Sequence, residues 1–348
     1  FYKPQQQSFY SMTKEFYTEF VSELKQGKLD KDSATKLKIR LAAKHGLKKI
    51  PNDVEVFLNL PEAEAKSLKQ QLLIKPVRTI SGIASISIMT KPYGCPHGRC
   101  TFCPGGPKSV FGDVPQSYTG REPATMRAIR AGFDPYLQVF SRLEQYAVTG
   151  QSFDKVELII QGGTFPWMPN DYKEKFIGYA YKAMNDFSSE FFSGTDNNEE
   201  ELEVDLKKYK EFFEMPGKFQ DEERVKRVTE KMLQLKGGDN SFNSSEEFLL
   251  QQQKLNETTK IRCIGLTIET KPDWGKTFHG DHMLKLGCTR VELGIESVYE
   301  QQLKLTNRGH TVKDARESLQ QLKDLGFKIN AHYMLGLPGS RRESDLEG

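Results

Sequence analysis

The sequence predicts an α/β fold with a parallel, closed or nearly closed sheet, preceded by a small helical region. Short apolar segments of the strand type recur between residues 83 and 335, and segments with helical spacing separate them. Such alternation indicates parallel pairing, because parallel neighbours need a crossover connection. Residues 1–74 show helical patterns only. We therefore expect a helical domain over residues 1–74 and a barrel over residues 75–348.

The helical region is basic in its second half. Phe9–Leu24 carries apolar residues at three- and four-residue steps, Ser33–His45 runs up to a glycine that can end a helix, and a third helix is expected from Pro61. Six cations with no acidic residue among them lie in the second helix and just after it, namely Lys36, Lys38, Arg40, Lys44, Lys48 and Lys49. A basic helix can be an ordinary solvated face, but this density favours a phosphate-binding surface.

The barrel region contains five predicted strands. They are Ile83–Met89, Val156–Gln161, Ile261–Glu269, Arg290–Ile295 and Phe327–Leu335. Helices are expected between them at Thr125–Arg130, Pro135–Ala147, Lys173–Met184 and Val312–Leu325. Residues of about 186–255 are predicted to be a polar helical insertion with an acidic stretch, Glu199-Glu200-Glu201, near its start. Because acidic surface repels RNA, no RNA contact is expected there.

Three of the five cysteines lie within nine residues, directly after the first strand. Cys95, Cys100 and Cys103 have the spacing Cys-x4-Cys-x2-Cys, and glycine and proline flank them. A loop of this composition can wrap three thiolates around one face of an iron–sulfur cube and leave one iron open for a small molecule. The alternative is a structural zinc site with His97 as fourth ligand. Such sites commonly pair two short clusters, and the sequence has no second one.

Composition limits the class of protein. With 348 residues, 37% hydrophobic and 28% charged, the chain has ordinary soluble composition. No apolar run reaches the roughly 18 residues of a membrane span, and the N-terminus lacks a signal-peptide core. Cys263 and Cys288 stand singly in apolar surroundings and are expected to be buried, inert thiols. An odd number of cysteines argues against disulfides, so we expect a cytoplasmic protein without a membrane partner.

The cysteine loop resembles the cluster loop of radical S-adenosylmethionine (SAM) enzymes, with one residue more than usual between the first two cysteines. With Pro96-His97 after the first cysteine and Pro104-Gly105-Gly106 after the third, it is similar to one family in particular. That family is the catalytic third subunit of Elongator and its archaeal and bacterial relatives, which modify the wobble uridine of tRNA. Further matching strings follow in order at 116–123, 154–165, 261–273, 289–297, 305–311 and 332–339.

The resemblance implies a partial (β/α)6-type radical SAM barrel in which Cys95, Cys100 and Cys103 hold a [4Fe–4S] cluster whose open iron binds SAM. It also implies that reductive cleavage of SAM yields a 5′-deoxyadenosyl radical, which takes hydrogen from the methyl group of acetyl-CoA. The carbon radical would then add to C5 of uridine 34 and give carboxymethyluridine. Family members continue into an acetyltransferase domain, so this chain is expected to bind cluster, SAM and tRNA without completing the modification.

The resemblance also assigns residues to the cofactors. Phe102 precedes the last cysteine and is placed to cover the cluster or stack on a base. Gly162 and Gly163 follow the second strand, where only glycine lets the methionine end of SAM approach the backbone. Thr164 comes next, where many relatives in the superfamily have Glu. Lys155 matches a lysine that the family assigns to acetyl-CoA, although by itself it reads as a solvated cation.

Glu269 ends the third strand and is a candidate for a contact to the ribose or amino group of SAM. An ion pair with Arg290 or Lys271 is the alternative for this carboxylate.

Four further residues are candidates for tRNA contact. A splayed-out base could stack on Tyr118 while Arg121 or Arg127 holds a phosphate, and Arg308 lies on the loop where substrate phosphate would pass. An ordinary helix start with Arg127 in a salt bridge is the alternative for the first three.

The partner expected from the resemblance is the anticodon stem–loop, whose target base must leave its stack. Acetyl-CoA is the expected co-substrate, the electron donor stays unidentified, and a homodimer or Elongator-type subunits remain open. The competing functions are another radical SAM RNA-modifying enzyme and a zinc-stapled tRNA-binding protein without catalysis.

Overall fold

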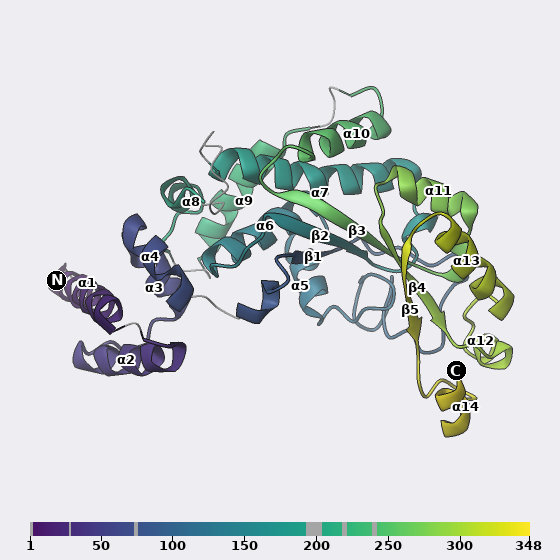
Figure 1. Cartoon of the computed structure of the whole chain (residues 1–348), viewed down its shortest axis with the longest axis horizontal. Helices are drawn as coiled ribbons and strands as arrows, with labels where there is room; N and C mark the ends of the chain where they lie inside the picture. The colour runs from purple at the N-terminus through teal and green to yellow at the C-terminus, as the bar shows by residue number, and fades with distance from the viewer. Residues whose placement is uncertain (1–2, 28, 73–75, 193–203, 218–220, 239–241) are drawn as a thin grey trace. The chain divides into compact units, whose positions relative to one another are not determined.

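The computed structural model describes residues 3–27, 29–72, 76–192, 204–217, 221–238 and 242–348 (Figure 1). The chain divides into two compact units. Unit 1 comprises Phe1–Gly82, Leu143–Phe153 and Glu190–Lys231, and unit 2 comprises Ile83–Arg142, Asp154–Ser189 and Met232–Gly348. The division falls after Gly82 rather than after residue 74, and much of the expected insertion belongs to unit 1. The acidic stretch Glu199-Glu200-Glu201 lies outside the described residues.

Unit 1 is helical. Its elements are α1 (Lys3–Gly27), α2 (Lys31–Lys44), α3 (Asp53–Asn59), α4 (Glu62–Leu72), the 3₁₀ turn η1 (Pro76–Thr79) and α8 (Leu206–Phe212). Helices α1, α2 and α4 correspond to the three that were predicted. Helix α3 was missed because it has only seven residues, although Asn52 and Glu55 form a capping box at its start. Lys210 Nζ of α8 donates to Leu60 O at 2.9 Å, so α8 packs where α3 ends.

Unit 2 is built on one parallel sheet with strand order β1-β2-β3-β4-β5. The strands are β1 (Ala84–Met89), β2 (Lys155–Gln161), β3 (Arg262–Thr270), β4 (Arg290–Glu296) and β5 (Lys328–Tyr333). All five agree with the predicted segments within two residues, which confirms the α/β prediction. The sheet has a continuous apolar face at Ile86, Leu158, Leu266 and Leu293, all fully buried.

Helices surround this sheet. Unit 2 contains α5 (Pro123–Arg130), η2 (Phe165–Trp167), α10 (Ser245–Asn256), η3 (Pro272–Trp274), α11 (Thr277–Lys285), α12 (Glu300–Leu305), α13 (Val312–Asp324) and α14 (Arg342–Glu347). Helices α6 (Pro135–Val148), α7 (Asn170–Phe191) and α9 (Glu222–Lys236) each cross a unit boundary.

Helices α10, α11 and α12 were not predicted from the sequence. Helix α11 was missed because glycine is a weak helix former. Glycine gives close packing there, since a Cβ at Gly280 would lie 2.4 Å from Leu325 Cδ1, at the end of neighbouring α13 (Figure 1).

No helix within the described ranges is both long enough and apolar enough to cross a lipid bilayer. The residues that carry chemistry gather instead at the carboxyl ends of the five strands, where parallel α/β folds place their sites.

Candidate functional site

The cysteine loop leaves the carboxyl end of β1 and is held there by backbone contacts. Thr90 N–H donates to Gln161 O at 3.0 Å, which continues the β1–β2 pairing into the loop. Cys103 N–H donates to Cys100 O at 3.1 Å and closes the second turn of the loop. The guanidinium of Arg99 donates to Cys103 O at 2.9 Å and to Pro104 O at 3.0 Å. These bonds give the loop a defined shape without regular structure.

The turn after α12 holds the same loop from the other side. Thr101 N–H donates to Thr306 O at 3.0 Å, and Asn307 Nδ2 donates to Arg99 O at 2.9 Å. Segments about 200 residues apart in sequence are thus joined directly at the candidate cluster site.

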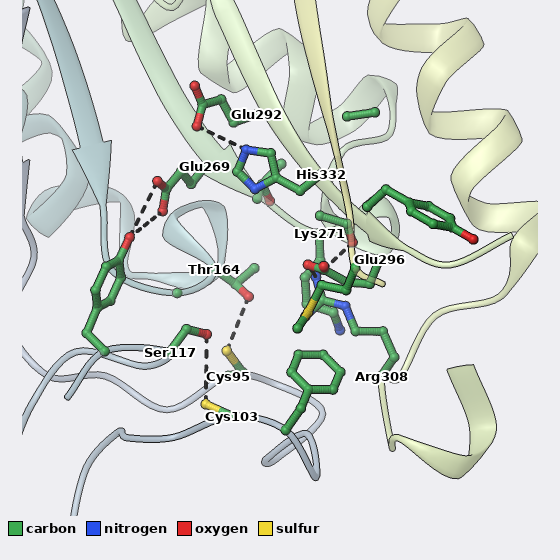
Figure 2. Close-up of a pocket in the computed structure, with 18 of the residues that line it drawn as sticks. Cys95, Cys103, Ser117, Thr164, Glu269, Lys271, Glu292, Glu296, Arg308 and His332 are labelled. Atoms are coloured by element: carbon green, nitrogen blue, oxygen red, sulfur yellow. Dashed lines mark hydrogen bonds and ion pairs between the residues drawn. The ribbon is translucent and has the colours of Figure 1, made fainter. Parts of the chain in front are cut away.

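The three thiols are free, and each has a polar side chain within hydrogen-bonding distance. Figure 2 shows Cys95 beside Thr164, and Cys103. Thr164 Oγ1 donates to Cys95 Sγ at 3.5 Å, Gln116 Nε2 donates to Cys103 Sγ at 3.0 Å, and His97 Nε2 lies 3.1 Å from Cys100 Sγ. Burial raises the pKa of Cys95. Donors aimed at sulfur suit thiolate ligands of an iron–sulfur cluster, because they spread the ligand charge.

A single metal ion is the alternative to a cluster at these thiols. Among the described residues, no group of three or more His, Cys, Asp or Glu side chains is placed to hold one ion. A cubic cluster takes each thiolate on a separate iron, so its three sulfurs need not converge on one point. The donor set of this loop therefore fits the cluster that the sequence predicted.

A cavity of about 620 Å³ opens beside the thiols. Cys95, Phe102 and Cys103 line one part of it (Figure 2). The glycine pair after β2 lies next to this part: Gly162 has φ +122°, and a Cβ there would lie 2.3 Å from Thr90 Oγ1. At Gly163, with φ +89°, a Cβ would lie 3.6 Å from Cys95 Sγ. The structure thus brings the cysteine loop, the glycine pair and Thr164 together.

The opposite wall of the cavity carries carboxylates from β3 and β4. Glu269 accepts hydrogen bonds from Tyr118 Oη at 3.2 Å and Gln161 Nε2 at 2.9 Å, and its burial raises its pKa. The alternative ion pair of Glu269 with Arg290 is not formed, because Arg290 pairs with Glu157 at 2.6 Å. The carboxylate of Glu269 thus lines the cavity and is already hydrogen-bonded to two protein side chains.

Tyr118 lies in the cavity wall rather than on the outer rim. Burial, and then the charge of Glu269, raise its pKa. Its neighbour Glu122 accepts from Thr119 N at 2.9 Å and from Thr125 Oγ1 at 3.0 Å, so the 116–123 string shapes the start of α5. Arg121 is exposed and Arg127 is partly exposed.

Arg308 is not on an exposed rim, in contrast to the prediction. Only 8% of its surface is exposed, and Nη2 donates to Gly294 O at 2.7 Å and to Glu296 Oε1 at 3.1 Å. Nη1 lies 3.7 Å from Cys100 Sγ. The buried guanidinium is stabilised by the carboxylate of Glu296, and its contacts connect β4 with the cysteine loop at Cys100.

Lys155 also lies away from the cavity. It opens β2, whereas the glycine pair follows the end of that strand, and its Nζ pairs with Asp154 at 3.1 Å. The structure does not bring this lysine to the thiols.

The basic helix of unit 1 has counter-charges after all. Lys38 is buried and pairs with Asp53 at 2.7 Å, Arg40 pairs with Glu23 at 2.5 Å, Lys44 pairs with Glu19, and Lys49 pairs with Glu55 at 3.0 Å. Four of the six cations therefore have acidic partners, which come from α1 and α3 and not from the basic segment itself. Lys36 and Lys48 are exposed.

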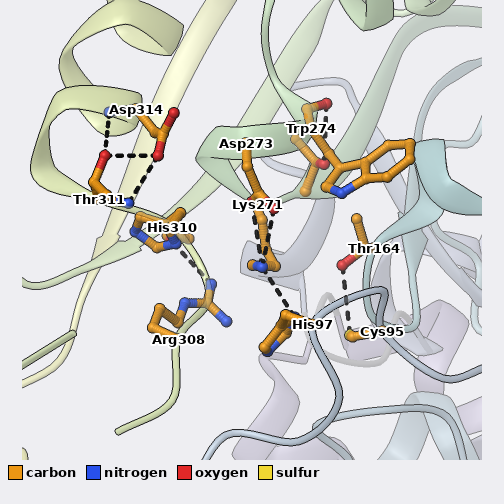
Figure 3. A network of polar contacts seen from close by, with 12 residues as sticks. Cys95, His97, Thr164, Lys271, Asp273, Trp274, Arg308, His310, Thr311 and Asp314 are labelled. Carbon is orange, nitrogen blue, oxygen red and sulfur yellow. Dashed lines mark hydrogen bonds and ion pairs between the residues drawn. The ribbon is translucent and has the colours of Figure 1, made fainter. Parts of the chain in front are cut away.

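Several cavity residues were missed from the sequence, namely Lys271, Glu292, Glu296 and His332, and so was Gln116, which donates to Cys103 Sγ. A signal was present in β4, where Glu292, Gly294 and Glu296 alternate and therefore point to one face of the strand. His97, considered earlier only as a zinc ligand, lies between Cys100 and Lys271 (Figure 3). Burial, with the nearby charges of Lys271 and Arg308, lowers the pKa of His97 to about 4.

The pair of Glu292 and His332 predicts a pH-dependent contribution to stability. Their side chains are 3.2 Å apart, and Glu292, with smaller effects of Glu269 and Glu296, raises the pKa of His332 above 6.5. His332 in turn lowers the pKa of Glu292 below 4.5, against the effect of burial. The stability that protonated His332 contributes is fully present below pH 6.5 and is lost as pH rises through its folded pKa. The stability that ionised Glu292 contributes is lost as pH falls through the folded pKa of this carboxylate.

His332→Asn should therefore lower the melting temperature most between about pH 4.5 and 6.5, and least at a pH well above the folded pKa of His332. Thermal unfolding over this pH range measures the effect. His279→Asn is the matched control, since burial lowers the pKa of His279 and its pH dependence has the opposite sign. An equal effect of His332→Asn at low and high pH would contradict a charged pair.

Comparison with known proteins gives consistent matches. Residues 13–80 match the family model of the ELP3 N-terminal domain, and residues 210–346 match the Radical SAM superfamily. The tRNA uridine(34) acetyltransferase of Methanocaldococcus infernus is 42% identical over 93% of this chain and 51% of its own length. Elongator complex protein 3 of Saccharomyces cerevisiae is 35% identical, over 99% and 52% respectively.

One solved structure is also similar. It is the Methanocaldococcus infernus Elp3 with an N-terminal deletion (1-46), which is 32% identical with a TM-score of 0.48, over 77% of this chain and 42% of that one. The chain spans about half the length of the curated relatives it matches.

Proposed function

Because the chain belongs to the Elp3 family of radical SAM proteins, we propose that it holds a [4Fe–4S] cluster on Cys95, Cys100 and Cys103 and acts with SAM on the wobble uridine of tRNA. The observation that carries this proposal is the set of three free thiols on one loop, each beside a polar side chain, with Cys95 and Cys103 lining the cavity at the carboxyl ends of the strands. The names of the curated relatives support uridine 34 as the target.

When bound, the cluster supplies the electron that cleaves SAM to a carbon-centred radical. The protein's own residues position the cluster and its ligand and shield them from solvent. Thr164, His97 and Gln116 donate to the three sulfurs, and the glycine pair leaves room for a ligand against the backbone beside Cys95. Phe102 covers the thiol side of the cavity.

The opposite wall suits the polar parts of SAM. Glu269 is held by Tyr118 and Gln161, and its oxygens retain lone pairs for a ribose hydroxyl or an ammonium group. A fixed carboxylate orients such a ligand at low entropic cost. We assign Glu269 this role.

For the substrates we propose acetyl-CoA and the anticodon stem–loop of tRNA. Carboxymethylation at C5 needs a two-carbon donor, and the relatives are named acetyltransferases. The flipped uridine would enter the cavity past Tyr118, and Arg121, Arg127 and the basic helix of unit 1 would hold phosphates. The names of further relatives support association with Elongator-type subunits, and the setting proposed is the cytoplasm.

The deciding experiment is anaerobic reconstitution with iron and sulfide. We expect a brown protein with about four irons per chain that cleaves SAM under strong reductant and binds an anticodon stem–loop RNA. A colourless protein with one zinc per chain and no SAM cleavage would refute the proposal.

RNA binding should depend on exposed lysines of unit 1. Changing both Lys36 and Lys48 to Gln is expected to reduce the slope of log affinity against log salt by about 2, since each phosphate contact contributes about 1. Filter binding of the stem–loop at several salt concentrations measures the slope. Lys38→Gln serves as control, because this buried lysine pairs with Asp53 and its loss should lower stability instead. An unchanged slope in the double variant would place the RNA elsewhere.

A further inference from the structure

We propose that His97 is a positioning residue that makes the cluster easier to reduce, by an N–H···S hydrogen bond to Cys100 that Lys271 enforces. The inference rests on the proposed function, because it takes the three thiols as cluster ligands. It gives His97 a role in the ligand environment of the cluster and not as a ligand itself.

A continuous chain of polar contacts ends on the sulfur of Cys100. His97 Nε2 lies 3.1 Å from Cys100 Sγ, and its other ring nitrogen, Nδ1, lies 2.9 Å from Lys271 Nζ. Lys271 in turn pairs with Asp273 at 3.2 Å (Figure 3). His97 belongs to the loop after β1, whereas Lys271 and Asp273 follow β3, so the chain of contacts links two strands across the sheet.

Lys271 decides which nitrogen of the ring carries the proton. An ammonium group has donors and no acceptor, and Lys271 pairs with the Asp273 carboxylate, which supports the ammonium form against the burial that lowers the pKa of this lysine. Nδ1 of His97 must therefore accept, which leaves the proton on Nε2, the nitrogen that faces the sulfur. With its proton there, Nε2 has no lone pair for a metal ion. This arrangement speaks against His97 as the fourth ligand of a zinc site.

The ring has little freedom to turn away. A Cβ on Gly309 would lie 2.4 Å from His97 Cβ and 2.7 Å from Cγ, so the backbone after α12 packs directly on the side chain. Gly309 has φ +78°, a conformation that favours glycine. The next residue back, Arg308, brings Nη1 to 3.7 Å from the same sulfur. Cys100 is thus approached by an imidazole donor and by a guanidinium charge.

Hydrogen bonds and positive charge at a ligand sulfur raise the reduction potential of an iron–sulfur cluster, because they stabilise the extra negative charge of the reduced form. The donors at Cys95 and Cys103 are neutral, Thr164 and Gln116. The Cys100 corner adds the guanidinium charge of Arg308 to the contact with the imidazole ring. The donor at this corner is fixed by Lys271 rather than by solvent.

The test is an EPR-monitored redox titration of the anaerobically reconstituted full chain. His97→Ala should lower the ratio of reduced to oxidised cluster at a fixed potential about tenfold, which for one electron is ~59 mV. Lys271→Met should shift the midpoint in the same direction, since the proton on Nε2 is no longer enforced. His97→Gln keeps an N–H donor and should recover part of the shift. Iron should stay at about four per chain in all three variants.

Lys276→Met is the matched control, because Lys276 pairs with Asp314 and Glu317 instead of joining this network. It should leave the midpoint unchanged. If His97→Ala does not fold, Lys271→Met decides, since it leaves the cysteine loop intact. Parental midpoints in the His97 and Lys271 variants would overturn the inference while leaving the proposed function in place. A parental chain that takes up no iron and cleaves no SAM would overturn both.

Discussion

Cys100→Ser is expected to abolish the iron–sulfur cluster and, with it, SAM cleavage. The variant loses one of three thiolate ligands, and a serine oxygen is a harder ligand that suits iron–sulfur clusters poorly. Changes around a metal ligand commonly lower affinity or activity 10–100-fold, so loss of the ligand itself should lower SAM cleavage by more than about 100-fold. Iron per chain, the visible absorbance and the release of 5′-deoxyadenosine measure the effect.

The matched control for this prediction is Cys288→Ala. Cys288 is also buried and free, but it precedes β4 at its amino end, and its thiol donates to Arg290 O at 3.0 Å. Removing this thiol should leave iron content and SAM cleavage at parental levels. Equal iron loss in the two variants would show that thiol number, rather than the loop, governs iron uptake. Parental cleavage in Cys100→Ser would exclude Cys100 as a ligand.

Arg308→Met is expected to destabilise unit 2 by about 3 kcal/mol. Its guanidinium is buried, and its loss leaves Glu296 at 9% exposure without a cationic partner. Removing one partner of a buried ion pair typically lowers stability by about 3–5 kcal/mol. Burial already raises the pKa of Glu296, so this carboxylate can take up a proton when its cationic partner is removed. Protonation offsets part of the lost stability, and we therefore expect a value at the lower end of this range. Urea unfolding of the reconstituted protein measures the change.

Two further variants separate this structural role from a contact with RNA. Adding Glu296→Gln to Arg308→Met removes the unpaired charge and should restore part of the stability. Arg121→Met is the exposed counterpart and should change stability by less than about 0.5 kcal/mol while weakening RNA binding. Full stability of Arg308→Met together with a smaller salt slope for RNA binding would instead support the exposed phosphate contact that the sequence suggested.

Much of the fold was predictable because its signals are local. The strand that ends at the cysteine loop alternates small and apolar residues, and the segment Val156–Gln161 leads into a glycine pair. Both patterns involve neighbours within a few residues, so they survive without knowledge of the tertiary structure. Helix α11 escaped prediction for the opposite reason: its Gly280 is favoured by the close contact with Leu325 rather than by helix propensity.

The electrostatic partners could not be read in the same way. Lys38 and Arg40 looked unopposed within their helix, yet Asp53 and Glu23 pair with them from neighbouring helices. Arg308 looked like a loop cation and is instead a buried partner of Glu296. The local sequence around a charged residue does not identify its ion-pair partner, because the partner depends on which helices and strands pack together.

The sequence by itself determined the order of the strands, the loop that carries the three thiols and the glycine pair that approaches them. Spacing of a few residues is sufficient for each of these. The tertiary structure alone decided that His97 meets Lys271, 174 residues away, and that Tyr118 meets Glu269. The physical reason is that the register of parallel strands sets which side chains converge at their carboxyl ends, and register depends on the packing of the whole sheet.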